Sequence, residues 1–228
     1  MYERLIALIG ENNLKKIENK KILLVGIGGV GGYALESLIR TGFKHVTIID
    51  GDLIEESNLN RQIISNKENV GYSKTDIAVK RSLAINPACD IKAFDIFLTI
   101  DNFKDYVCED YDYIIDACDD IKIKIELIKY AKEHNIKIIS SLGTARKLDP
   151  QKLKIITLNK TFNDPLAKKL RYELKRENIP LNIPVLWSEE DAVPVKEVLG
   201  SAIFVPASAG LLLVNYIFLD ILKERASI

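Results

Sequence analysis

The 228-residue chain has few residues that bind metals or form disulfides, with only three cysteines and two histidines. Cys89, Cys108 and Cys118 are odd in number and show no CxxC spacing, while His45 and His134 are isolated. A disulfide scaffold and a structural zinc site are therefore not expected, and this cysteine usage fits a reducing cytosol. The charged N-terminal residues do not resemble a secretory signal, so we expect a cytoplasmic protein.

An excess of charge of either sign is also absent, because 32 Lys and Arg residues balance 32 Asp and Glu residues. The net charge therefore does not predict a nucleic-acid-binding protein. We expect no DNA partner, and any RNA contact has to depend on a local basic patch. The 47% hydrophobic and 28% charged residues are typical of a soluble globular protein, and the length suffices for one α/β domain.

One stretch, residues 198–219, lacks charge altogether. It is long enough to span a membrane, which takes about 20 apolar residues. However, Gly200, Pro206 and Gly210 interrupt it, together with several polar residues. We therefore predict a short strand or loop followed by a buried helix over about residues 208–225, and no membrane partner.

Short apolar segments alternate with helical patterns through the first two-thirds of the chain. The predicted strands are 21–26, 46–50, 90–94, 113–116 and 137–141, and the predicted helices run to about 41, over 73–86 and over 121–134. This alternation predicts a Rossmann-like, doubly wound α/β fold with a mainly parallel sheet. Ligands of such sheets bind beyond the carboxyl ends of the strands.

The pattern changes after residue 150 into a C-terminal mixed extension. We predict a strand over 153–158, a helix that Asp164 caps with Pro165 in its first turn, and an edge strand over 183–187. Linkers, repeats and low-complexity tracts are not evident. The chain 1–228 is therefore interpreted as a single domain with a helical arm (1–20), a nucleotide-binding core (21–150) and an extension for substrate or dimer contacts (151–228).

A glycine-rich turn, GIGGVG, follows the first strand, with glycines at Gly26, Gly28, Gly29 and Gly31. Such glycines let backbone N–H groups approach a phosphate at the N-terminus of a helix. Asp50 ends the second strand, where a carboxylate can bind a ribose hydroxyl. The pattern favours a nucleotide but does not separate ATP from NAD, and a turn needed only for packing would show the same glycines.

The next segment identifies a family. Residues 50–62, DGDLIEESNLNRQ, and 70–74, VGYSK, resemble the D-x-D-x-V-x-x-S-N-L-x-R-Q … G-x-x-K block of the ThiF-type and ubiquitin-activating superfamily. Arg61 and Lys74 can neutralise a triphosphate, and Asn58 can hold it by hydrogen bonds. The resemblance implies that ATP is bound by the two phosphate-contacting cations and their neighbours, Asp50, Asp52, Asn58, Arg61, Gln62 and Lys74.

Residues 115–120, IDACDD, resemble the D-x-x-D-N turn of the same superfamily. The resemblance implies that Asp119 binds Mg²⁺, which prefers one or two carboxylates plus phosphates and waters. Asp120 stands where the superfamily often has Asn, so the choice between the two acids stays open. Lys124 lies one helical turn further on, where the family places a basic residue.

The N-terminal residues Tyr2-Glu3-Arg4-Leu5-Ile6 resemble the R-Y-[ND]-R-Q-I opening of these enzymes. The resemblance implies a homodimer in which Arg4 reaches across to the ATP site of the partner as a catalytic residue. The alternative is an ordinary surface arginine on an N-terminal helix.

Two later segments, residues 148–150 (LDP) and 160–171 (KTFNDPLAKKLR), resemble the tRNA threonylcarbamoyladenosine dehydratase branch, and the likeness runs over about residues 1–222. It implies an ATP- and Mg²⁺-dependent enzyme that adenylates the threonine carboxylate of a modified adenosine beside the anticodon. The activated acyl group then closes into a ring, so no enzyme nucleophile is needed. Sulfur-transfer proteins are further partners that the resemblance allows.

Carrier-activating members of the superfamily usually have a reactive cysteine after the fifth strand, whereas this chain has no cysteine after Cys118. An adenylyltransferase for the C-terminus of a sulfur-carrier or ubiquitin-like protein is nevertheless the alternative function. A regulatory nucleotide-binding module and an NAD oxidoreductase are weaker alternatives.

A local basic patch is predicted on the helix that follows Asp164. Lys168, Arg171 and Lys175 share one face, with the cations Lys160, Lys169 and Arg176 nearby. This face is interpreted either as a contact for an RNA backbone or as a solvated helix surface, because Glu173 and Glu177 interrupt it. Arg146 and Lys147, in the loop after the fifth strand, have no predicted role.

Overall fold

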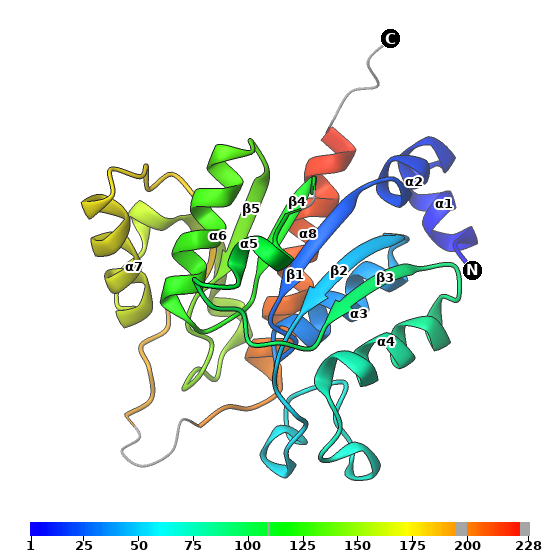
Figure 1. Cartoon of the computed structure of the whole chain (residues 1–228), viewed down its shortest axis with the longest axis horizontal. Coiled ribbons are helices and arrows are strands. Elements are labelled where there is room, and N and C mark those ends of the chain that lie inside the picture. The colour runs from blue at the N-terminus through cyan, green and yellow to red at the C-terminus, as the bar shows by residue number, and fades with distance from the viewer. Residues whose placement is uncertain (109, 195–199, 224–228) are drawn as a thin grey trace.

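The computed structural model describes residues 1–108, 110–194 and 200–223 (Figure 1). One seven-stranded sheet has the order β3-β2-β1-β4-β5-β7-β6, and all neighbours are parallel except β6 and β7. The strands are β1 (Lys21–Val25), β2 (His45–Ile49), β3 (Asp90–Phe94), β4 (Tyr113–Asp116), β5 (Lys137–Ser141), β6 (Leu153–Thr157) and β7 (Pro184–Ser188). The predicted Rossmann-like fold with a mixed C-terminal extension is confirmed.

Helices cover both faces of this sheet, as parallel strands require. They are α1 (Glu3–Ile9), α2 (Glu11–Glu18), α3 (Gly31–Arg40), α4 (Lys74–Ile85), α5 (Phe103–Tyr106), α6 (Ile121–Glu133), α7 (Pro165–Arg176) and α8 (Phe204–Lys223). Alternate residues of β1 point to opposite faces: Leu24 packs in the core with α3 and α8, and Leu23 packs with α5 and α6. A third cluster joins α6, α7 and β7.

Helix α8 lies in the core beside α3 rather than apart from the domain. A Cβ at Gly210 would lie only 2.4 Å from the carbonyl oxygen of Val30, so the glycine allows the two helices to touch. Within the described residues, α8 is the one helix with the length and apolarity of a membrane span, and 44% of its most apolar window is buried. The buried helix is therefore confirmed, although it begins at Phe204 instead of Ser208, because Pro206 is tolerated in a first turn. Its predicted end at 225 lies outside the described residues.

The predicted edge strand is wrong. β7 lies between β5 and β6, with Val185, Leu186 and Trp187 buried, and β6 forms the edge. Pro184 does not force an edge position because it is the first residue of the strand, where the missing N–H is least needed.

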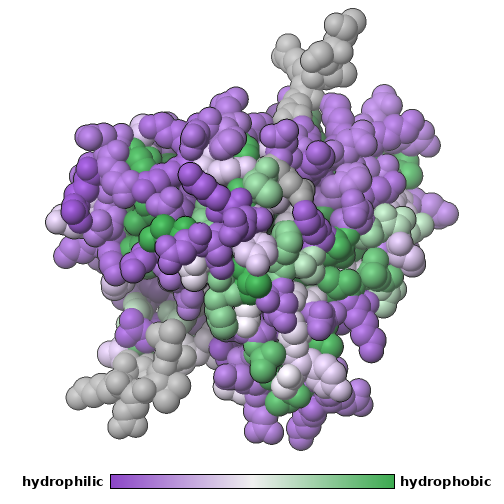
Figure 2. All heavy atoms as spheres, viewed as in Figure 1, coloured by the Kyte–Doolittle hydropathy of each residue, from purple (hydrophilic) through white to green (hydrophobic). Residues whose placement is uncertain are grey.

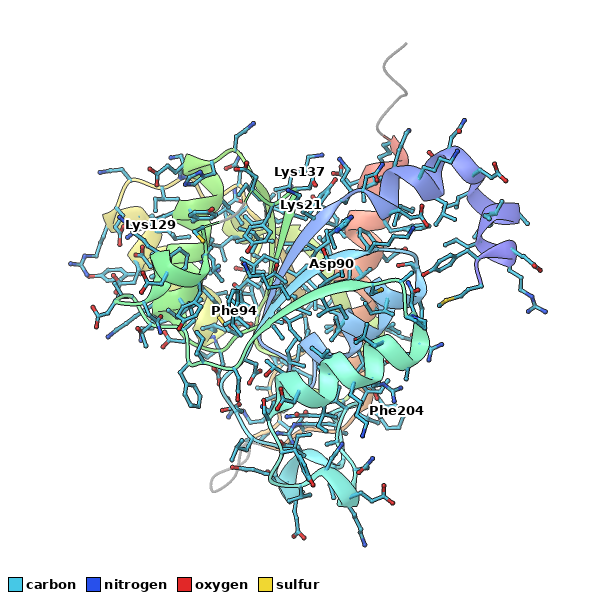
Figure 3. All side chains as sticks on the ribbon, turned by 45° about the vertical axis from the view of Figure 1, so that its right-hand side comes forward. Lys21, Asp90, Phe94, Lys129, Lys137 and Phe204 are labelled. Carbon is cyan, nitrogen blue, oxygen red and sulfur yellow. The ribbon has the colours of Figure 1, made fainter. Side chains whose placement is uncertain are left out.

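The predicted helical arm consists of α1 and α2. Tyr2 anchors it, because its hydroxyl donates to the carbonyl oxygen of Ile39 at 3.1 Å and accepts from Nδ2 of Asn86 at 2.8 Å. Figure 1 shows the arm at the opposite end of the sheet from the loops that follow β1 and β2. Figure 3 places Lys21 and Lys137, the first residues of β1 and β5, at that same end.

Candidate functional site

A cavity of about 610 Å³ opens at the carboxyl ends of β1, β2 and β4, a size within the range of small-molecule sites. It brings together nearly all the site residues predicted from the sequence, which are Gly26, Gly28, Gly29, Asp50, Asp52, Asn58, Arg61, Gln62, Lys74 and Asp119. The sequence placed the loop after β5 near this site but not its Thr144 and Ala145, which line the cavity; Ser201, just before α8, and Pro206, in its first turn, also line it and were not predicted. Folding back of the chain after residue 140, rather than any local motif, brings them there.

The glycine-rich turn forms the floor of this cavity. Gly26 has a φ of +90°, and a Cβ there would lie 2.7 Å from the carbonyl oxygen of Ala117. Gly31 is not among the residues that line the cavity, and a Cβ there would overlap the Gly26 carbonyl oxygen at 1.8 Å, so the tight turn itself requires this glycine; its contact with the nucleotide stays a prediction. The turn leads into α3, whose N-terminus supplies unpaired N–H groups and positive potential for an anion.

Asp50 fixes the turn to the end of β2. Its Oδ2 accepts a hydrogen bond from the Ile27 N–H at 2.6 Å, and its Oδ1 accepts one from the Asp52 N–H at 2.9 Å. Burial raises the pKa of Asp50, against the opposing effect of Lys74 and of these hydrogen bonds. Each oxygen keeps a second lone pair, so the carboxylate can still accept from a ribose hydroxyl.

Lys74 supplies a cation to the cavity from the first turn of α4. Ser73 caps this helix, with its hydroxyl accepting from the Asp76 N–H. The Lys74 ammonium lies 2.6 Å from Oδ2 of Asp52; the lysine side chain is 6% exposed and the aspartate side chain 53%. One carboxylate therefore holds the ammonium, and Asp52 has solvent on its other side.

The 3-10 turn at Glu56–Asn58 presents the second cation. Oδ1 of Asn58 accepts a hydrogen bond from the Glu55 N–H, so this side chain shapes the turn. The sequence predicted that the same side chain binds the triphosphate. Arg61 donates to the Ser57 carbonyl oxygen at 2.6 Å and to Oδ1 of Asn60, which leaves further donors. Gln62 is 6% exposed, and its buried Oε1 has no hydrogen-bond partner among the described residues, as expected of a ligand-binding amide.

The two neighbouring acids after β4 have different surroundings. Asp120 caps α6, where its Oδ1 accepts from the N–H groups of Lys122 at 2.7 Å and Ile123 at 3.4 Å. Asp119 is exposed in the cavity, with no hydrogen bond to its carboxylate from any described residue. The geometry therefore favours Asp119 for a metal ion. Within the described residues no cluster of three His, Cys, Asp or Glu side chains could hold a metal ion.

Directly behind these acids lies an ion pair whose full geometry the sequence did not predict. The Lys124 ammonium contacts both oxygens of Asp116 at 3.0 Å and the Ser141 carbonyl oxygen at 2.8 Å, and both charged side chains are completely buried. Burial alone would lower the pKa of Lys124, but the Asp116 carboxylate raises it above its ordinary value. The pair joins β4, α6 and β5 beneath the turn that carries Asp119.

Several other residues singled out in the sequence lie elsewhere or have other contacts. Arg4 is exposed on α1 and does not line the described cavity of its own chain. Lys147 is buried and donates to the Glu190 carbonyl oxygen, and the Arg146 N–H donates to the Gly200 carbonyl oxygen at 2.8 Å. These two residues therefore connect the loops beside the cavity. The sequence predicted no role for them.

The Cys118 thiol donates to Oδ1 of Asp116 at 3.1 Å. Burial and the Asp116 carboxylate raise the pKa of Cys118 well above its ordinary value, which disfavours a thiolate nucleophile.

Comparison with known proteins agrees with this geometry. The model of the ThiF family matches residues 2–162. The tRNA threonylcarbamoyladenosine dehydratase of Bacillus subtilis (strain 168) is 33% identical over 234 residues, which cover 95% of this chain and 92% of that protein. The Escherichia coli (strain K12) enzyme of the same name is 40% identical over 170 residues, 75% of this chain and 63% of that protein.

Solved structures show the same likeness. The crystal structure of the E. coli tRNA N6-threonylcarbamoyladenosine dehydratase in complex with ATP has a TM-score of 0.92 and 34% identity, covering 98% of this chain and 94% of that one.

Proposed function

The chain belongs to the ThiF family, and from this membership we propose that it is an ATP-dependent tRNA threonylcarbamoyladenosine dehydratase. The observation that carries the proposal is the cavity beyond β1, which Arg61, Lys74 and Asp119 line together with the glycine-rich turn. Its relatives of that name align over most of the chain, so the likeness extends well beyond the nucleotide-binding core.

The proposed reaction begins with adenylation. The threonine carboxylate of the modified adenosine attacks the α-phosphorus of ATP, and pyrophosphate leaves with its electron pair. Lys74 and Arg61 neutralise the negative charge that develops on the phosphates, and the N-terminus of α3 adds partial positive charge. A nucleophilic atom of the substrate's own carbamoyl group then attacks the carbonyl carbon of the adenylate and gives up its proton. AMP leaves with the former carboxylate oxygen, so ring closure removes the elements of water from the nucleoside.

Two further groups complete the proposed ATP site. Asp50 accepts from the ribose, as its position at the end of β2 allows. Asp119 would hold Mg²⁺, which neutralises phosphate oxygens when bound. In the free chain Asp52 holds the Lys74 ammonium, so we expect the triphosphate to take over this contact.

The assembly and surroundings of the enzyme belong to the same proposal. We expect a homodimer in which Arg4, exposed on α1, enters the cavity of the partner subunit. A cytoplasmic location, a role for sulfur-transfer proteins and the division into arm, core and extension also remain predictions from the sequence.

The test is conversion of tRNA in vitro. The protein is incubated with ATP, Mg²⁺ and total tRNA from cells that lack dehydratase activity, and the nucleosides are analysed by mass. We expect threonylcarbamoyladenosine to lose one water only when ATP is present. Unchanged tRNA, together with pyrophosphate exchange that requires a carrier protein ending in Gly-Gly, would replace the dehydratase by the carrier-activating alternative.

A further inference from the structure

Helix α7 begins at Pro165, just beyond the residues 2–162 that match the general family model. The generic adenylating core therefore does not account for this helix. We propose that its exposed face is a ridge that contacts the phosphate backbone of the tRNA anticodon arm. This inference rests on the proposed function, because it concerns how the same site obtains its substrate.

The exposed face of α7 is free of acidic residues. Ala167, Leu170 and Leu174 are buried against the domain, and the opposite face exposes one proline, one tyrosine and otherwise only cations, namely Pro165, Lys168, Lys169, Tyr172, Lys175 and Arg176. This arrangement follows from the 3.6-residue period of a helix, which puts every third or fourth residue on one side. A neutral chain thus concentrates positive charge along one line.

The acidic residues that interrupt the sequence do not interrupt this face. Glu173 is half-buried at its margin and pairs with Arg176 at 3.0 Å. Glu177 follows the helix and pairs with Lys129 of α6, a residue labelled in Figure 3. Arg171 was predicted to share the basic face, but it is half-buried and donates to the carbonyl and hydroxyl oxygens of Thr161. The free cations are therefore Lys168, Lys169 and Lys175, for which no ion pair with a described residue exists.

The ridge starts beside the cavity. Thr144 and Ala145 line the cavity wall, and the neighbouring Gly143 lies against α7, since a Cβ on it would be 3.6 Å from Oδ2 of Asp164. Asp164 is the residue that caps α7. If the modified adenosine of the tRNA is inserted into the cavity, the RNA on either side of it would lie next to the first turn of α7. Lys168 and Lys175 follow along this helix, about 10 Å apart along its axis.

Exposed aromatic rings favour RNA over an acidic protein as the partner. Tyr172 is 61% exposed in the centre of the ridge, with the Arg176 guanidinium 5.8 Å from its ring. Phe162 is 52% exposed just before α7 and packs edge-on against Trp187 at 4.5 Å. Unpaired bases of RNA loops stack on such rings while lysines contact the phosphates. Figure 2 shows the surface over α6 and α7 as mainly hydrophilic with scattered hydrophobic residues.

The test removes the three free cations together, in a Lys168→Ala/Lys169→Ala/Lys175→Ala protein. A Lys15→Ala/Lys80→Ala/Lys104→Ala protein is the matched control, because it loses the same charge from exposed positions on α2, α4 and α5. Affinity for threonylcarbamoyladenosine-bearing tRNA is measured by filter binding over a range of KCl concentrations, and ATP affinity is measured alongside.

We expect the ridge variant to bind tRNA about 10- to 100-fold more weakly, and the slope of log K against log[salt] to fall by about 2 to 3, since each phosphate contact contributes about 0.7–0.9. ATP affinity should not change, and the control should resemble the unmodified protein. A Lys→Arg triple at the same positions should retain binding.

Unchanged tRNA affinity and salt slope in the ridge variant would overturn the proposal, as would an equal loss in the control. A ridge variant that loses binding to an acidic protein but not to tRNA would also overturn it. Ring closure by the unmodified protein is measured separately: if that reaction is absent, the proposed function fails, whereas a normal reaction with an unaffected ridge variant refutes the ridge alone.

Discussion

One lysine–aspartate pair lines the cavity and a second lies beneath the turn that carries Asp119, and the two pairs differ mainly in solvent access. Lys74 and Asp52 meet at 2.6 Å with the aspartate side chain 53% exposed, whereas Lys124 and Asp116 meet at 3.0 Å with both side chains fully buried. A half-open pair can exchange one partner for an anionic ligand at little cost. A closed pair cannot, because removing either charge leaves the other without water or a counter-ion. The same two residue types therefore serve ligand binding in one place and structure in the other.

The strongest way to break this comparison is Lys124→Met. We expect it to lower the free energy of unfolding by about 3–5 kcal/mol, because the buried Asp116 carboxylate loses its partner. Urea denaturation measures the loss. A Lys124→Met/Asp116→Leu double variant should regain part of it; if the single variant is as stable as the unmodified protein, the closed pair is not structural.

Lys74→Ala should reduce turnover while leaving stability nearly unchanged, which is the reverse of the effect expected for Lys124→Met. We expect turnover to fall about 10²–10³-fold because charge developing on the phosphates is no longer neutralised. The urea midpoint should change little, since Asp52 remains solvated. Near-normal turnover in a folded Lys74→Ala protein would refute the ligand role of the open pair.

The neighbouring acids Asp119 and Asp120 extend the contrast. Asp119→Asn should raise the Mg²⁺ concentration needed for half-maximal turnover, because the metal ion loses its carboxylate ligand, without changing stability. Asp120→Ala should instead cost about 1 kcal/mol of stability through loss of the α6 cap, and Asp120→Asn should restore the cap. Titration of Mg²⁺ against turnover, with thermal unfolding of each variant, would reveal a reversed assignment.

Variants of Arg4 test whether a second subunit contributes this arginine to the cavity that contains Lys74 and Asp52. Arg4→Ala and Lys74→Ala proteins should each be weakly active, and their mixture should recover part of the turnover, because one site of a mixed dimer has both residues. Mass spectrometry of the intact mixture checks that subunits exchange. Exchange without recovery would contradict an Arg4 that acts on the partner.

The smallest effect is expected from the cysteines. Replacing all three with Ala or Ser should keep ring closure within about tenfold, with the loss confined to packing near Asp116. The Cys118 thiol donates to that carboxylate, so the substitution probes the closed pair without breaking it. An acyl group trapped on a thiol would contradict a reaction without an enzyme nucleophile.

The sequence predicted best those features that are local in the chain. The GIGGVG turn, the capped helices at Ser73 and Asp164 and the five parallel strands each depend on near neighbours, and they occur as expected. Pairings between distant residues could not be read in this way. The prediction that β7 is an edge strand was wrong, because β6 pairs with its free side and makes it internal. That pairing joins segments about 30 residues apart, so no local pattern shows it.

The same limit applied to individual side chains of the site. Lys124 was expected at a basic position of the family, but its contact with the Ser141 carbonyl oxygen depends on the pairing of β5 with β4. Arg171 looked like part of a basic face, but the turn at Thr161 accepts its hydrogen bonds. Charge in a sequence shows what a residue can bind, and the fold decides whether solvent or another chain segment satisfies it.

The close approach of α3 and α8 bears on whether the nucleotide-binding segment is a portable unit. A Cβ at Gly29 would lie 3.3 Å from Pro206 Cβ, and Gly210 touches the backbone where α3 begins, so the turn for phosphate rests against a helix more than 170 residues further along the chain. A fragment that stops at residue 162 would keep every predicted ATP ligand and yet lack the surface that supports them. Swapping that segment between relatives therefore requires α8 to travel with it.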